Sequence, residues 1–172
     1  GGIAALPVLL QPMFHACADV LPDTPALAEQ TVIFVNSNDL CTTEVHFMRA
    51  VRGQQRPQRV RLLTSALYDV EVRGVDKRTI EVRPEGGWHS NPADSLLRGG
   101  DDPLPVGAHV ALAGLDIEIM AHNAAGFVSA ARFRFDVPLD DPSLRWFVTR
   151  DMAPLPFRPP AAGESVRLAR HF

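Results

Sequence analysis

The feature that most constrains this fold is an alternation of apolar and charged side chains that recurs in short runs along the chain. Successive side chains on a β-strand point to opposite faces, so this period is typical of strands with one buried and one solvated face. The alternating runs are residues 59–62, 68–73, 80–83, 115–119 and 129–135. Short runs separated by turn residues predict a mainly β fold built from hairpins.

The numbering of the apolar positions constrains how the runs 68–73 and 80–83 pair, because their apolar residues have even numbers. Residues that lie opposite each other in the hairpin must then sum to an even number, so the loop must have an odd length. Residues 76–78 meet this condition. The predicted pairs are Val72 with Val82, Arg73 with Glu81 and Glu71 with Arg83.

The same parity applies to the runs 115–119 and 129–135, whose apolar residues have odd numbers. We expect the odd loop His122–Gly126 to join them, since Asn123 and Gly126 are residues that favour turns. The acidic residues of the first run, Asp116 and Glu118, should then face the row formed by Arg132 and Arg134. A row of arginines can bind anions, but acidic neighbours favour a neutralised sheet face.

The remaining elements complete the fold class. Thr31–Val35 is a continuous apolar run and predicts a buried strand, and a helix is expected over 40–52 with Gly53 at its end. Further strands are expected at 106–112, 144–148, 154–160 and 165–168, and a short helix at 91–97. The pattern predicts an antiparallel β-sandwich or open barrel with one or two short helices and an N-terminal helical segment.

The first thirty residues differ from the rest of the chain. Leu6–Val20 is apolar and can form one helix, which the prolines of Leu21–Pro25 interrupt. The apolar start is shorter than the roughly 20 residues that span a bilayer. We therefore expect a hydrophobic N-terminal segment at 1–30, interpreted as the end of a membrane helix plus a linker, a β-sandwich domain at 31–168 and a tail at 169–172.

Composition narrows the classes of function. Lys and Arg total 17 against 20 Asp and Glu, and the two signs are interspersed, so nucleic acid is not an expected partner. The two cysteines, Cys17 and Cys41, do not form a CxxC pair. A disulfide between them is one interpretation, and two buried free thiols is the favoured one, because free cysteine is among the most buried residue types.

The densest polar cluster is the loop that follows Gly86 and Gly87. Its candidate ligand-binding residues are Trp88, His89, Asn91 and Asp94. Residues of these types on a loop can line the mouth of a small-ligand site. The favoured alternative is structural, with Trp88 filling the edge of the core and Asn91 capping a short helix.

Catalytic and metal motifs are weak. Cys41 and His46 are close in sequence, but their spacing is not a recognised nucleophile pattern. The six histidines have no zinc-site spacing, and no glycine-rich phosphate loop occurs, so we expect neither a metal nor a cofactor. An enzyme is the less favoured class, and a hydrolase would use His46 or His89 with a nearby carboxylate.

Several segments resemble a known group of proteins. They are Val32–Asn36, Asp76–Trp88, Gly114–Ile119, Phe133–Trp146 and Pro156–Pro160. Together they are similar to the C-terminal soluble domain of a group of bacterial multi-pass membrane proteins of unknown function. The similarity covers about residues 5–168, and its motifs are structural. It implies an extracytoplasmic, membrane-tethered domain and no particular activity.

From these observations we expect a non-catalytic extracytoplasmic domain of a membrane-tethered protein. Its expected partners are its own membrane helices or a partner membrane subunit. The alternatives are a small-ligand-binding module that uses the loop Trp88–Asp94 and a hydrolase with a His and carboxylate site.

Overall fold

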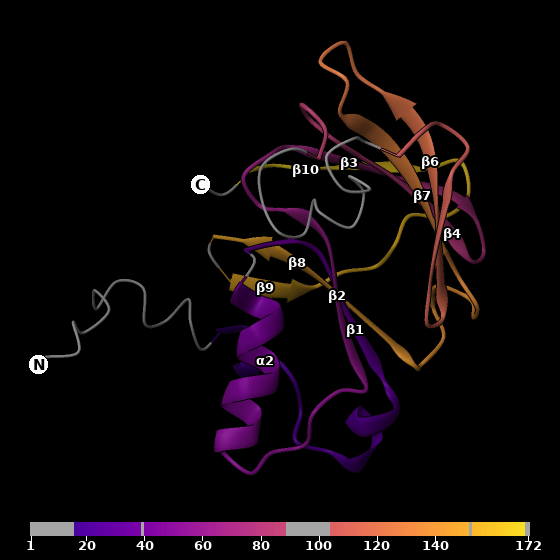
Figure 1. The fold of residues 1–172 in the computed structure, drawn as a ribbon. Coiled ribbons are helices and arrows are strands. Elements are labelled where there is room, and N and C mark those ends of the chain that lie inside the picture. Colours follow the sequence, from indigo (N-terminus) through magenta and orange to yellow (C-terminus); the bar gives the residue numbers. More distant parts are fainter. Residues whose placement is uncertain (1–15, 39, 89–103, 152, 171–172) are drawn as a thin grey trace, which may run out of the picture.

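Two open β-sheets pack face to face, and the helix α2 (Leu40–Val51) lies against the outer side of the smaller sheet (Figure 1). The structure is a computed structural model that describes residues 16–38, 40–88, 104–151 and 153–170. The predicted mainly β fold is confirmed, as an open two-sheet arrangement and not a closed barrel.

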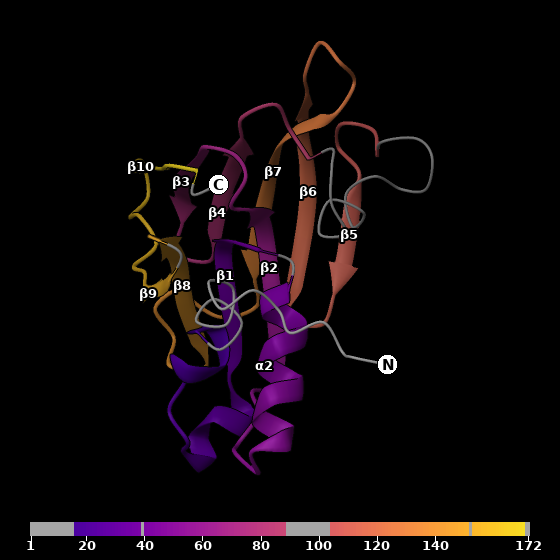
Figure 2. The same ribbon diagram turned by 90° about the vertical axis from the view of Figure 1, so that its left-hand side faces the viewer.

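The larger sheet has six antiparallel strands in the order β10-β3-β4-β7-β6-β5, which Figure 2 shows side by side behind the smaller sheet. The strands are β3 (Val70–Asp76), β4 (Thr79–Pro84), β5 (His109–Leu112), β6 (Leu115–His122), β7 (Val128–Phe135) and β10 (Ser165–Leu168). All of its pairings are antiparallel, as the hairpin periodicity predicted.

The pairing of β3 with β4 is the predicted one, but the turn between them is shorter. Val72 lies opposite Val82, and the expected charge pairs are also formed. The register shifts between Gly74 and Asp76, so that Asp76 pairs with Thr79 and the turn has two residues, not three. A β-bulge of this kind adds one residue to one strand. The parity of the apolar positions therefore predicted the residue pairs correctly. The bulge between Gly74 and Asp76 accounts for the extra residue of the expected three-residue loop.

The pairing of β6 with β7 also sets acidic residues against arginines. Asp116 lies opposite Arg134, and Glu118 lies opposite Arg132, as predicted. The connecting loop is 123–127, one residue further along than expected. The side chain of Asn123 explains the shift, because its Oδ1 accepts hydrogen bonds from the backbone N–H groups within the loop.

The smaller sheet is mixed, with the strand order β2-β1-β8-β9. Its strands are β1 (Thr31–Ser37), β2 (Arg59–Ser65), β8 (Leu144–Arg150) and β9 (Ala153–Pro156). β1 is parallel to both of its neighbours, which departs from a purely antiparallel sandwich. The helix α2 (Leu40–Val51) makes the crossover between β1 and β2 that parallel neighbours require.

β1 is buried on both faces, which explains why its sequence is a continuous apolar run instead of an alternating one. Ile33 and Val35 belong to the core between the two sheets. Val32 and Phe34 belong to a second core on the helix side of the smaller sheet. The strand therefore connects the sandwich to the layer that carries α2.

The N-terminal segment supplies part of this second core. Residues 16–19 form one helical turn, and Pro25–Glu29 form the 3-10 helix η1. Cys17, Leu21 and Leu27 are buried against the outer face of the smaller sheet. The described part of the expected 1–30 segment thus packs on the β domain. No helix among the described residues is long and apolar enough to cross a membrane.

The side chain of Arg49, on α2, binds the backbone of this N-terminal segment. Its side chain is 1% exposed, and its guanidinium donates hydrogen bonds to the carbonyls of Ala18, Leu21 and Pro22 at 2.9–3.0 Å, and to that of Gln55. Five N–H donors in a rigid fork suit arginine to such a cluster of carbonyls. One side chain therefore satisfies the backbone groups of a segment that has little regular structure.

Replacing Arg49 with alanine should destabilise the protein by about 3 kcal/mol, because several buried carbonyls lose their donor. Arg52, one turn away, pairs with Asp19 at the surface, so its replacement with alanine should cost less than about 1 kcal/mol. Urea unfolding of the two variants measures the difference. Equal losses would mean that the Arg49 contacts do not hold the segment.

Candidate functional site

A disulfide joins the N-terminal segment to the start of α2. Cys17 and Cys41 are bonded, with their Cα atoms 5.5 Å apart. The favoured prediction of two free thiols was wrong, because burial of Leu21 and the hydrogen bonds of Arg49 bring the segment to α2. Closing a loop with a sequence separation of 24 stabilises a fold by about 3 kcal/mol in the chain-entropy account. Such bonds are typical of oxidising, extracytoplasmic compartments.

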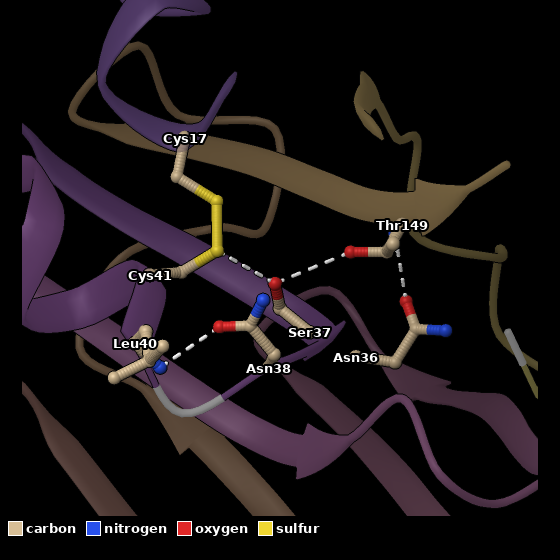
Figure 3. Close-up of a disulfide and its surroundings, with 7 residues drawn as sticks. All are labelled: Cys17, Asn36, Ser37, Asn38, Leu40, Cys41 and Thr149. Carbon is tan, nitrogen blue, oxygen red and sulfur yellow. Dashed lines mark hydrogen bonds between the residues drawn. A yellow bond between two sulfur atoms is a disulfide. The ribbon is translucent and has the colours of Figure 1, made fainter. Parts of the chain in front are cut away.

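One side of this bond contacts a hydroxyl group from the end of β1, which in turn contacts a hydroxyl group from β8 (Figure 3). The Ser37 Oγ lies 2.9 Å from the Cys41 Sγ and is the donor, because a disulfide sulfur carries no hydrogen. The Thr149 hydroxyl donates to Ser37 at 3.2 Å, and the Thr149 N–H donates to the Asn36 Oδ1 at 3.0 Å. A polar chain thus runs from the sheet to the sulfur.

Glu44 places a carboxyl beside the same bond. It follows Cys41 by three residues, so the two side chains are neighbours on the surface of α2. Glu44 is 5% exposed, and its Oε1 has no hydrogen-bond partner among the described residues. Burial raises the pKa of Glu44 to about 7, assisted by the charge of Asp19 and opposed by that of Arg52. Its burial, its raised pKa and its unpartnered oxygen set Glu44 apart from the other described carboxylates.

The raised pKa of Glu44 gives a signed prediction for stability. Between the ordinary value of 4.5 and about 7, the folded state binds more protons than the unfolded state, so the free energy of unfolding should fall as the pH rises. Replacing Glu44 with glutamine should remove this dependence. The free energy of unfolding of the variant should therefore rise relative to that of the parent between about pH 5 and about pH 8.

Urea unfolding at the two pH values measures this change. The matched control is Glu164→Gln, which alters an exposed glutamate. A stability difference between parent and Glu44→Gln that stays constant over the range would show that Glu44 has an ordinary pKa.

Trp88 lies within the core between the sheets. It is 2% exposed, its indole N–H donates to the carbonyl of Leu63 at 2.9 Å, and its ring lies 6.4 Å from that of Phe133. This position agrees with the favoured structural interpretation of Trp88. The other candidates of the loop, His89, Asn91 and Asp94, lie outside the described residues, so a ligand site there stays a prediction.

Among the described histidines, His109 lies close to a carboxylate. The His109 Nδ1 lies 2.8 Å from the Asp116 Oδ2, and this hydrogen bond raises the pKa of His109. Both side chains are about half exposed on the outer face of the six-stranded sheet. In the register of β5 against β6, His109 lies opposite Glu118, which makes Asp116 its diagonal neighbour on the same face. His46 is half-buried. Its burial lowers its pKa, and the positive charge of Arg56 lowers the pKa further.

One arginine of the predicted row, Arg132, pairs with a buried carboxylate on the same sheet face, and Arg134 lies opposite Asp116 in the register. Glu81 is 4% exposed and accepts hydrogen bonds from Arg83 at 2.9 Å and from Arg132 at 3.2 Å. Burial raises the pKa of Glu81, but the hydrogen bonds and charges of the two arginines outweigh it and hold the pKa below its usual value. Arg83 and Arg132 are thus engaged with the carboxylate of Glu81, which disfavours an anion site at these two arginines.

The outer side of α2 carries large apolar side chains in contact with solvent. Leu40, Phe47 and Val51 are 50%, 64% and 67% exposed, and their spacing puts them on one side of the helix. We call these three residues the α2 stripe. The residues that follow its two ends contact the N-terminal segment, since Cys41 is bonded to Cys17 and Arg52 pairs with Asp19.

Comparisons with protein-family models, with curated proteins and with solved structures found no match. The resemblance to a group of bacterial membrane proteins therefore stays a prediction.

Proposed function

We propose that this chain is a non-catalytic, extracytoplasmic domain of a membrane-tethered protein, and that the α2 stripe is its membrane-side face. The domain packs against the protein's own membrane helices or a partner membrane subunit, and the α2 stripe contacts the adjoining surface of the bilayer. The observation that carries the proposal is the exposure of Leu40, Phe47 and Val51 on a helix that is cross-linked to the apolar N-terminal segment.

The energetics of the α2 stripe support an apolar partner. Covering a large aliphatic or aromatic side chain contributes roughly 1.5–3 kcal/mol relative to leaving it in water. The three side chains are half or more exposed, so most of this energy is available to a binding partner. A contiguous exposed apolar patch is typical of protein–protein or membrane contact sites.

The position of the disulfide gives the patch its context. Cys17 lies near the C-terminal end of the apolar run Leu6–Val20, and it is bonded to Cys41, the residue after Leu40. A chain that enters the domain from a membrane at this point brings the stripe close to the bilayer. The bond also supports the compartment, because disulfides persist in oxidising, extracytoplasmic surroundings.

The catalytic alternative has less support. The described histidine and carboxylate pair, His109 with Asp116, lies half exposed on an open sheet face. A hydrolase site is expected in a concave pocket that partly excludes water. For that reason we favour a packing role over hydrolysis.

Flotation with phospholipid vesicles tests the proposal. The whole chain of residues 1–172 is mixed with phosphatidylcholine and phosphatidylglycerol vesicles, and the bound fraction is measured. Replacing Phe47 and Val51 together with serine should reduce binding by about 10-fold or more, because two large apolar contacts are lost.

The matched control is Val106→Ser, which removes an apolar side chain that is 59% exposed outside α2. This variant should bind as the parent does. A parent chain that does not float, or a double variant that floats as well as Val106→Ser, would overturn the assignment of the α2 stripe as the membrane-side face.

A further inference from the structure

Three potential metal ligands converge at the start of α2. The sulfur atoms of Cys17 and Cys41 and a carboxylate oxygen of Glu44 all lie within 4.8 Å of one another, and all three residues are buried. Figure 3 shows the two cysteines approaching from separate segments of the chain. Glu44 joins them from the next turn of the same helix as Cys41.

A purely structural disulfide does not require a carboxylate beside it. Burying a polar group without a hydrogen bond costs about 1–3 kcal/mol, and the Glu44 Oε1 has no such bond among the described residues. This unpartnered oxygen is independent evidence that the cluster has a ligand in another state of the protein. A divalent cation bound there would give the oxygen a partner and offset the cost.

We infer that the reduced protein binds a thiophilic divalent cation of the zinc class through the two cysteine sulfurs and the carboxylate of Glu44. Zinc takes sulfur ligands at roughly 2.3 Å and carboxylate oxygens at roughly 2.0–2.2 Å in a tetrahedral arrangement. Ligand atoms of such a site are therefore about 3.5–4 Å apart, and the present cluster already confines them within 4.8 Å. The sulfurs need only separate when their bond is broken.

The disulfide and the metal site exclude each other, because the same two sulfur atoms form both. Conversion from one to the other takes a reduction and then a release of protons. A dithiol reductant gives two electrons and two protons to the Cys17–Cys41 bond and is itself oxidised to a disulfide, which leaves two thiols. Binding of the cation then releases the two thiol protons, together with any proton that Glu44 holds. Ligation involves no further change in oxidation state.

The surrounding hydroxyl groups fit this use. Ser37, which lies 2.9 Å from the Cys41 Sγ, can donate to the thiolate form as it does to the disulfide. Thr149 in turn donates to Ser37. Outer hydrogen bonds of this kind orient metal ligands. Three protein ligands leave a fourth position for water, as in open zinc sites. The inference does not depend on the proposed membrane-side packing, and it applies to the chain before its disulfide has formed or after the bond has been reduced.

Cobalt(II) is the probe, because it reports thiolate ligation by its absorption. The whole chain is reduced in denaturant with a phosphine, which overcomes the burial of the bond, and is then refolded with cobalt(II). We expect one equivalent to bind, with a sulfur-to-cobalt charge-transfer band. Zinc should displace it. The oxidised chain, in which the ligands are joined, should give no such band.

Variants assign the ligands. Glu44→Gln should weaken cobalt binding by about 10-fold or more, whereas the control Glu164→Gln should leave it unchanged. Cys17→Ser should remove the two-thiolate spectrum. If Glu44→Gln does not refold, Glu44→His serves instead, since it supplies a nitrogen ligand and should shift the visible cobalt bands.

Two results would overturn the inference. One is refolded, reduced protein without a charge-transfer band at an excess of cobalt, or a band that the oxidised chain also shows. The other is a cobalt affinity and spectrum that neither Glu44 variant changes. If the reduced chain folds only when metal is added, recovery of its near-ultraviolet circular dichroism on adding zinc supports the site, and failure to recover contradicts it.

Discussion

The bond between Cys17 and Cys41 is the constraint on which the outer layer of this molecule depends. The segment around Cys17 has one helical turn and a short 3-10 helix, so it has few backbone hydrogen bonds of its own. The covalent link at Cys41 and the guanidinium of Arg49 fix it against the sheet instead. Together they bury the outer face of β1, and they leave the Leu40, Phe47 and Val51 side of α2 uncovered.

The two-sided burial of β1 explains why one chain combines a hairpin sandwich with a parallel crossover. One face of the strand closes the sandwich, where Ile33 and Val35 meet the six-stranded sheet. The other face packs on α2 and the N-terminal segment through Val32 and Phe34. Polar groups collect where this strand ends, next to the disulfide. The unusual chemistry of Glu44 is therefore a consequence of the crossover that brings α2 back over β1.

Sequence patterns were most informative where residues alternate. The hairpin partners of Val72 and Asp116 followed from parity and charge, because a one-residue slip exposes a whole apolar set. The bulge before Asp76 had no such signal. The parallel pairing of β1 was not predicted, and the disulfide of Cys17 was the less favoured of two interpretations, because both features depend on contacts between distant segments. Nothing in the sequence distinguished Glu44, since the segment that carries Cys17 was not expected to pack beside it.

Hydrogen exchange measured by mass spectrometry tests the central claim most directly, namely that the disulfide holds the outer layer onto the β-sandwich. The oxidised chain is compared with the double variant Cys17→Ser/Cys41→Ser. The account predicts faster exchange in residues 16–30 and in α2, with β3, β4, β6 and β7 unchanged, because the outer layer opens as its own unit. Equal protection of residues 16–30 in the two proteins would contradict the account.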